Sequence, residues 1–163
     1  MHLNWVDYAS MAFVALVGAI QFLRATRDFS RVLYETIFLI GAVVLAVKLF
    51  QPVHDLVHLS YALSFLLLSL LGVLLAIVLA ALVNTRLAFG FGAFSYVFGL
   101  LLAIGCAYSL GHVAIRTPFI AFGHLNPAFY DAVRRSWMAR DLLYFRTFVE
   151  VLAILRVARW LNM

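Results

Sequence analysis

Two long apolar runs decide the fold: 61-YALSFLLLSLLGVLLAIVLAALV-83 and 95-SYVFGLLLAIGCAYSLGHVAIR-116. A short polar and glycine-bearing connection, residues 84–94, joins them. A helix needs about 20 apolar residues to cross the hydrocarbon core of a bilayer, and each run has that length. We therefore predict that both runs are membrane-spanning helices.

Both runs carry small residues at every fourth position. These are Gly72, Ala76 and Ala80 in the first run, and Gly99, Ala103, Ala107 and Gly111 in the second. Positions four apart share one face of a helix, so each helix has a stripe where another backbone can approach closely. Chance spacing in an Ala- and Gly-rich sequence is the alternative. We predict that these residues pack helices, and the short connection favours a hairpin of the two runs.

The composition places the chain in a membrane. Hydrophobic residues make up 66% of the 163 positions and charged residues 12%, with a mean hydropathy of +1.06. A soluble domain is about half apolar and a quarter charged. The net charge of +5 suits the flanks of membrane spans, so we expect the lipid bilayer as partner and no nucleic acid. The lone Cys106 excludes an internal disulfide.

Two further spans precede these runs, at about residues 5–23 and 32–50. The short loop between them holds Arg24, Arg27 and Arg31, and short loops rich in Arg lie in the cytoplasm. The fold class predicted is an all-α integral membrane protein. Its membrane bundle is residues 1–116, with four spans at about 5–23, 32–50, 61–83 and 95–116.

Residues 117–163 have a different character. We predict a loop at 117–127, followed by a basic segment. Residues 142–155 are apolar apart from Arg146, Thr147 and Glu150, and fourteen residues are too few for an easy crossing. A C-terminal amphipathic helix in the interface fits best, and a tilted fifth span is the alternative. With a cytoplasmic first loop, four spans put this basic tail outside, although basic segments favour the cytoplasm. We give the first loop more weight, because the rule is strongest for short loops.

Four polar residues near the ends of the first two spans are candidate functional groups: Asp7, Arg27, Arg31 and Glu35. Asp7 lies close enough to the end of its span to reach water, beside Trp5 and Tyr8, which suit the interfacial aromatic belt. Glu35 lies one turn inside its span, where it can pair with Arg31 four residues earlier. The functional alternative for Glu35 is a proton or ion site.

Residue pairs that suggest chemistry are incomplete. His54 and His58, four apart, could point at one zinc ion, but two ligands do not complete a site. Ser109 and His112 share a helix face and could serve an intramembrane hydrolase as nucleophile and base. Nothing marks an oxyanion hole or a third residue for that pair. We therefore predict no catalytic residues, no metal and no cofactor.

Three stretches resemble the colicin V production protein (CvpA) family of bacterial inner-membrane proteins. They are residues 3–8 (LNWVDY), 27–31 (RDFSR) and 98–103 (FGLLLA), which are similar to the family's start, its basic first loop and its glycine-led fourth span. The likeness covers about residues 3–116. Departures are Asp28 in place of a loop glycine, Val32 in place of an acidic residue, and Ser95 in place of an Asp.

The resemblance implies a four-span inner-membrane protein linked to peptide-toxin export and envelope homeostasis, without established catalytic residues. The function predicted is that of a non-enzymatic accessory or scaffold protein, packed within one copy, as a homo-oligomer or with other membrane proteins. A small oligomeric channel or transporter is the alternative, because small-residue faces can also line a narrow pathway.

Overall fold

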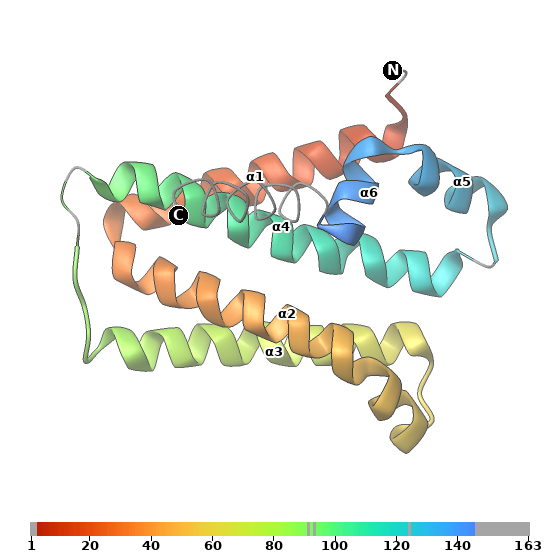
Figure 1. Cartoon of the computed structure of the whole chain (residues 1–163), viewed down its shortest axis with the longest axis horizontal. Coiled ribbons are helices and arrows are strands. Elements are labelled where there is room, and N and C mark those ends of the chain that lie inside the picture. The colour runs from red at the N-terminus through yellow and green to blue at the C-terminus, as the bar shows by residue number, and fades with distance from the viewer. Residues whose placement is uncertain (1–2, 91, 93, 124, 146–163) are drawn as a thin grey trace, which may run out of the picture.

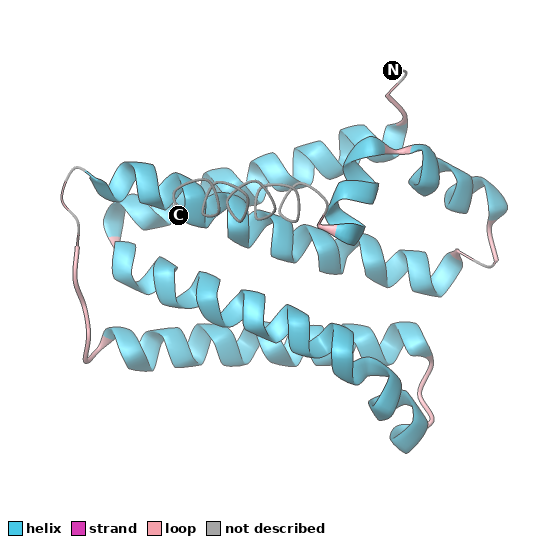
Figure 2. Cartoon of the chain, in the orientation of Figure 1, coloured by secondary structure: helices cyan, strands magenta, loops and turns pink. Residues whose placement is uncertain are grey.

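The computed structural model describes residues 3–90, 92, 94–123 and 125–145, and in this part of the chain every regular element is a helix (Figure 2). The helices are α1 (Trp5–Arg27), α2 (Phe29–Val57), α3 (Tyr61–Asn84), α4 (Phe94–Phe122), α5 (Pro127–Arg135) and α6 (Trp137–Tyr144). The helices α1 to α4 are each long and apolar enough to cross a membrane. The predicted all-α fold with four membrane-spanning helices is confirmed.

The long helices form two layers, as Figure 1 shows. The helix α2 packs along α3, α1 packs along α4, and α2 also contacts α4 across the layers. The expected hairpin of α3 with α4 was therefore wrong as the main packing, since these two helices touch far less than either touches its layer partner. The connection after Asn84 instead carries the chain from one layer to the other (Figure 1).

Small residues lie at close approaches between helices in both layers. A Cβ atom on Gly72 of α3 would lie 2.8 Å from the Ala42 Cβ atom of α2. A Cβ atom on Gly99 of α4 would lie 3.0 Å from the Ala25 Cβ atom of α1. The stripes in α3 and α4 thus face α2 and α1 respectively, which a repeat within one helix cannot specify.

The remaining stripe residues occupy the interior of the bundle. Ala76 and Ala80 of α3 are buried, as are Ala103 and Ala107 of α4. A Cβ atom on Gly111 would lie 2.9 Å from a methyl carbon of Leu142 in α6. The α4 stripe therefore packs against α6 at one end and against α1 at the other.

Two helices run beyond their predicted spans, through internal prolines. The helix α4 continues through Pro118 to Phe122, so the first part of the predicted loop at 117–127 is helical. Proline removes one backbone donor, and nearby hydroxyl groups make this tolerable in membrane helices. The Thr117 hydroxyl donates to the Val113 carbonyl (2.9 Å), next to the Ala114 carbonyl that Pro118 leaves without its helical donor. In the same way α2 passes through Pro52 and ends at Val57.

The short helices α5 and α6 lie over the N-terminal end of α1 and the C-terminal half of α4 (Figure 1). The chain after four spans thus returns to the side on which α1 begins. The predicted amphipathic helix at 142–155 overlaps α6 only through Tyr144, and its part from residue 146 onward lies outside the described residues.

We expect Gly72→Leu to separate α2 from α3, because a Cβ atom at this position would lie 2.8 Å from the Ala42 Cβ atom, which can move only with its backbone. Overpacking of this kind costs about 1–3 kcal/mol and should lower the midpoint of thermal unfolding in detergent by about 5 °C. Gly41→Leu on α2 is the matched control, because a Cβ atom there meets nothing within 4 Å. Equal midpoints for the two variants would contradict this account of the interface.

Candidate functional site

The Glu35 carboxylate joins α1 to α2. It is buried, and its Oε1 atom accepts from Arg24 Nη2 at 2.8 Å and from Arg31 Nε at 3.2 Å. Arg24 also donates from Nη1 to the Gln21 side chain. The pairing with Arg31 was predicted from the sequence, whereas Arg24, from the other helix, was not. The arrangement neutralises an acid inside the span, where an unpaired charge is costly.

Arg27 is the last residue of α1, and its side chain is exposed beside this cluster. No described residue forms a salt bridge with it. It is therefore a surface cation at the end of the bundle, outside the group of side chains that Glu35 brings together.

A second polar contact at this end ties α3 to the turn between α1 and α2. The Asn84 side chain donates to the Asp28 carboxylate at 3.3 Å and accepts from the Ser30 hydroxyl. Asp28 also caps α2 by accepting from the Arg31 backbone N–H at 3.2 Å. The sequence signal for this contact was the polar Asn84 at the end of the α3 stripe, but its partners 54 and 56 positions away were not predicted.

Asp7 lies at the opposite end of the bundle and is only 2% exposed, so the prediction that it reaches water was wrong. Its Oδ2 atom accepts from the Asn4 backbone N–H at 3.0 Å, which completes a capping box at the start of α1. Its Oδ1 atom accepts from the Ser136 hydroxyl at 2.7 Å and from the Met138 backbone N–H at 3.1 Å. One carboxylate thus caps two helices and holds α6 on α1.

Asn4 strengthens the same attachment. Its side-chain oxygen accepts from two backbone N–H groups of the first turn of α1, and its amide nitrogen donates to the Ala132 carbonyl of α5 at 2.7 Å. The start of α1 is therefore bound to α5 through Asn4 and to α6 through Asp7.

Ser109 and His112 are both buried, but they do not bond to each other. The Ser109 hydroxyl donates to the Gly105 carbonyl of its own helix at 2.8 Å. The Nδ1 atom of His112 lies 2.9 Å from the Leu142 carbonyl, which can only accept, so Nδ1 is the donor. Nε2 is then free to accept from Arg116 Nη1 at 3.4 Å. His112 therefore joins α4 to α6, whereas the Ser109 hydroxyl bonds only within α4.

Arg116 was not singled out from the sequence. Its guanidinium lies 5.6 Å from the ring centroid of Phe50 on α2 and 5.4 Å from that of Phe65 on α3. Such cation–π contacts are worth about 0.5–2 kcal/mol each, more where water is excluded. Arg116 therefore links α4 to the α2–α3 layer, near the connection between α2 and α3.

The two histidines that suggested a zinc ion, His54 and His58, have different surroundings. His54 stacks on Tyr61, with ring centroids 3.8 Å apart, and His58 ends α2 in a left-handed conformation with φ of 56°. The two imidazoles therefore do not share one helix face. Within the described residues, no group of three His, Cys, Asp or Glu side chains could hold a metal ion.

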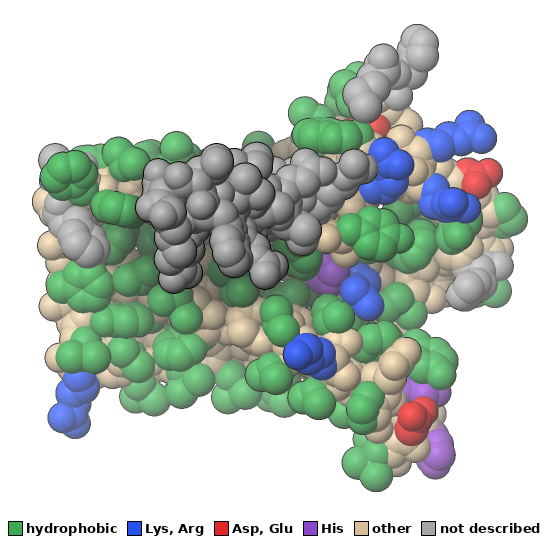
Figure 3. All heavy atoms as spheres, in the orientation of Figure 1, with side chains coloured by type: hydrophobic (Ala, Val, Ile, Leu, Met, Phe, Trp, Pro, Cys, Tyr) green, Lys and Arg blue, Asp and Glu red, His purple; other side chains and the backbone are tan. Residues whose placement is uncertain are grey.

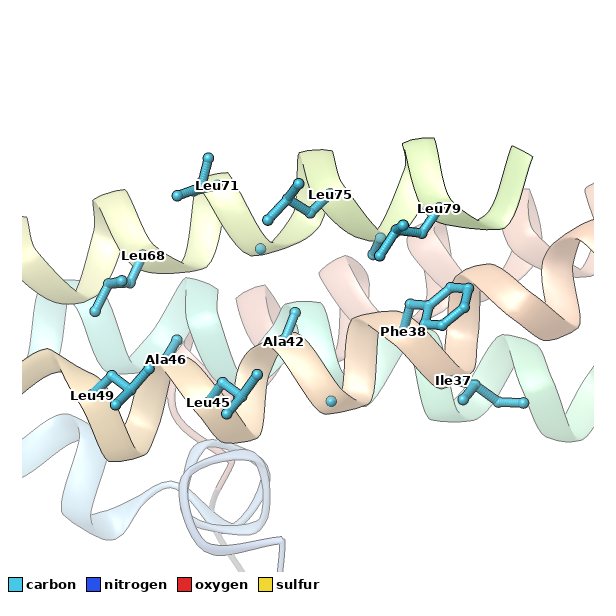
Figure 4. Close-up of a pocket in the computed structure, with 13 residues that line it drawn as sticks. Ile37, Phe38, Ala42, Leu45, Ala46, Leu49, Leu68, Leu71, Leu75 and Leu79 are labelled. Atoms are coloured by element: carbon cyan, nitrogen blue, oxygen red, sulfur yellow. The ribbon is translucent and has the colours of Figure 1, made fainter. Parts of the chain in front are cut away.

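An apolar groove of about 500 Å³ runs along the outer face between α2 and α3. Its walls include Leu45, Leu71 and Leu75, each more than half exposed, and small residues such as Gly41 and Ala42 leave it open (Figure 4). Many hydrophobic side chains of the long helices are exposed, and Figure 3 shows them in green along the visible face of the α2–α3 layer. Such a surface is suited to contact with lipid acyl chains.

Fold and surface together define a multi-pass α-helical membrane protein. Comparison of the chain with protein-family models, curated protein sequences and solved structures finds no match. The resemblance to the CvpA family remains a prediction from the short sequence stretches that carry it.

Asp7→Ala should loosen α5 and α6, because it removes the acceptor for Ser136 and Met138 and half of the α1 capping box. Each lost bond leaves a buried donor unpaired, at about 1–3 kcal/mol. Tryptic cleavage after the exposed Arg134 and Arg135 should become about tenfold faster or more, since 1.4 kcal/mol corresponds to tenfold.

Asp131→Ala removes an exposed carboxylate from α5 itself and is the control for that experiment. It should be cut at the wild-type rate. An Asp7→Ala protein that is equally resistant would show that the carboxylate does not hold the two short helices.

Proposed function

We propose that the protein is a non-enzymatic accessory or scaffold protein of the bacterial inner membrane, related in role to the CvpA family in toxin export or envelope homeostasis. One observation carries the proposal: the buried acids and the buried histidine of the described spans are bonded to other helical segments of the same chain. Asp7, Glu35 and His112 each bond to a different helix. Polar groups used in this way stabilise a bundle and are not held open for a substrate.

The packing between the layers supports the same role over a conducting one. Leu39 and Val43 of α2, Ala76 of α3 and Cys106 of α4 form a buried apolar cluster. Side chains therefore fill the centre of a single copy. A channel would need several copies around a shared axis, as in the small oligomeric channel that the sequence left as the alternative function.

Gene deletion in the host bacterium, with complementation, tests this role. We expect the deletion to reduce peptide-toxin export or to raise sensitivity to detergent in the medium. The Ser109→Ala variant should correct both defects as well as the wild-type protein does, because the Ser109 hydroxyl bonds only to its own helix. Loss of complementation by Ser109→Ala at normal protein level would favour the hydrolase instead.

Reconstituted vesicles provide the second arm of that experiment. An accessory protein should give ion flux no higher than empty vesicles. A flux that Glu35→Gln abolishes would replace the accessory role with a channel through the bundle.

We further propose that the loop between α1 and α2 is cytoplasmic, on the basis of its Arg residues. In a Cys106→Ser background, single cysteines replace Arg27 and Ala128, both exposed and at opposite ends of the bundle. An impermeant maleimide should reach position 128, and should reach position 27 only after the inner membrane is permeabilised. The reverse labelling would invert this orientation.

A further inference from the structure

A pocket of about 250 Å³ lies where α4 leaves the span and meets α5 and α6. It is lined by Phe119, Val133, Arg134, Arg140, Leu143 and Tyr144. Figure 3 shows Arg side chains, in the blue that marks Lys and Arg, gathered over the part of the molecule that Figure 1 labels α5 and α6. The pocket therefore combines a concave apolar wall with two guanidinium groups.

Both guanidiniums are available for an anion. Within the described part of the chain, neither Arg134 nor Arg140 forms a salt bridge. Arg134 lies over the Tyr130 ring, with its guanidinium carbon 5.5 Å from the ring centroid, and a cation–π contact of this kind does not neutralise its charge. The N–H groups of a guanidinium have a fixed geometry. They form a planar fork that matches phosphate oxygens. The nearby acid on α5, Asp131, is exposed and does not line the pocket.

Aromatic side chains indicate that this end of the bundle lies at the headgroup level. Trp5 and Tyr8 at the start of α1, Trp137 in α6 and Tyr144 in the pocket are between 48% and 70% exposed. The Trp5 ring lies 6.3 Å from that of Phe129 in α5, which places α5 in the same belt. Trp and Tyr gather where hydrocarbon meets water. The pocket thus opens at the depth of lipid phosphates, with Phe119 and Leu143 as its apolar wall.

We propose that this pocket binds the phosphate of an anionic phospholipid headgroup, held by Arg134 and Arg140. The apolar wall contacts the glycerol and upper acyl carbons of the same lipid. Arg side chains recognise a phosphate group by charge-assisted, bidentate hydrogen bonds. The lipid also covers the joint between α4, α5 and α6, so it stabilises the attachment of the short helices. This inference does not depend on the accessory role proposed above.

Native mass spectrometry of the full, delipidated chain tests the site, with dioleoyl phosphatidylglycerol and dioleoyl phosphatidylcholine as probes. The Arg134→Gln/Arg140→Gln variant should bind phosphatidylglycerol about tenfold more weakly or worse, because it loses charge-assisted hydrogen bonds. Its affinity for phosphatidylcholine should not change. The control is Arg27→Gln/Arg86→Gln, which removes two exposed Arg residues from the other end of the bundle and should change phosphatidylglycerol affinity less than twofold.

A conservative variant keeps the test valid if the Gln substitutions disturb folding. Arg134→Lys/Arg140→Lys retains the charge and loses the planar fork, and we expect an intermediate loss of about threefold. Wild-type affinity in both the Gln and Lys variants would overturn the proposal. An equal loss in the control pair would also overturn it, by showing attraction to overall charge. Displacement of phosphatidylglycerol by an equal concentration of inorganic phosphate would overturn it in favour of a free-anion site.

Discussion

The close approach of paired helices at small residues is the constraint on which this structure depends. Lipid tails are as apolar as Leu, so apolar side chains gain little by leaving lipid for a helix interface. Gly72 against Ala42 and Gly99 against Ala25 let two backbones approach where larger side chains would hold them apart. These contacts create the α2–α3 and α1–α4 layers. The two layers then meet through the contact of α2 with α4.

Polar side chains then determine which helices are held next to each other. Glu35 fixes α2 to α1, Asn84 fixes the end of α3 to the turn before α2, and Asp7 fixes α6 to α1. Each of these groups would be costly in lipid if it had no partner, so its bond both removes that cost and selects one arrangement. Asp7 and Glu35, two of the four candidate functional groups in the sequence, therefore help to define the bundle.

The two ends of the molecule differ in what they offer to the surroundings. At the α1–α2 end, Arg24 and Arg31 are already bonded to Glu35. At the other end, Arg134 and Arg140 line a pocket and are not tied to an acid among the described residues. Between the ends, the surface is apolar and open along the α2–α3 groove. This apolar surface is suited to contact with lipid acyl chains.

The sequence by itself determined the membrane class, the four spans and the local Arg31–Glu35 pair, because length, composition and i,i+4 spacing act within one helix. It also identified which face of α3 and α4 would pack. Only the tertiary structure decided that α3 packs on α2, since a small-residue stripe marks a face without naming the partner that covers it. The burial of Asp7 was equally beyond the sequence, because its partner Ser136 lies 129 positions away and joins it only when α4 returns the chain to the start of α1.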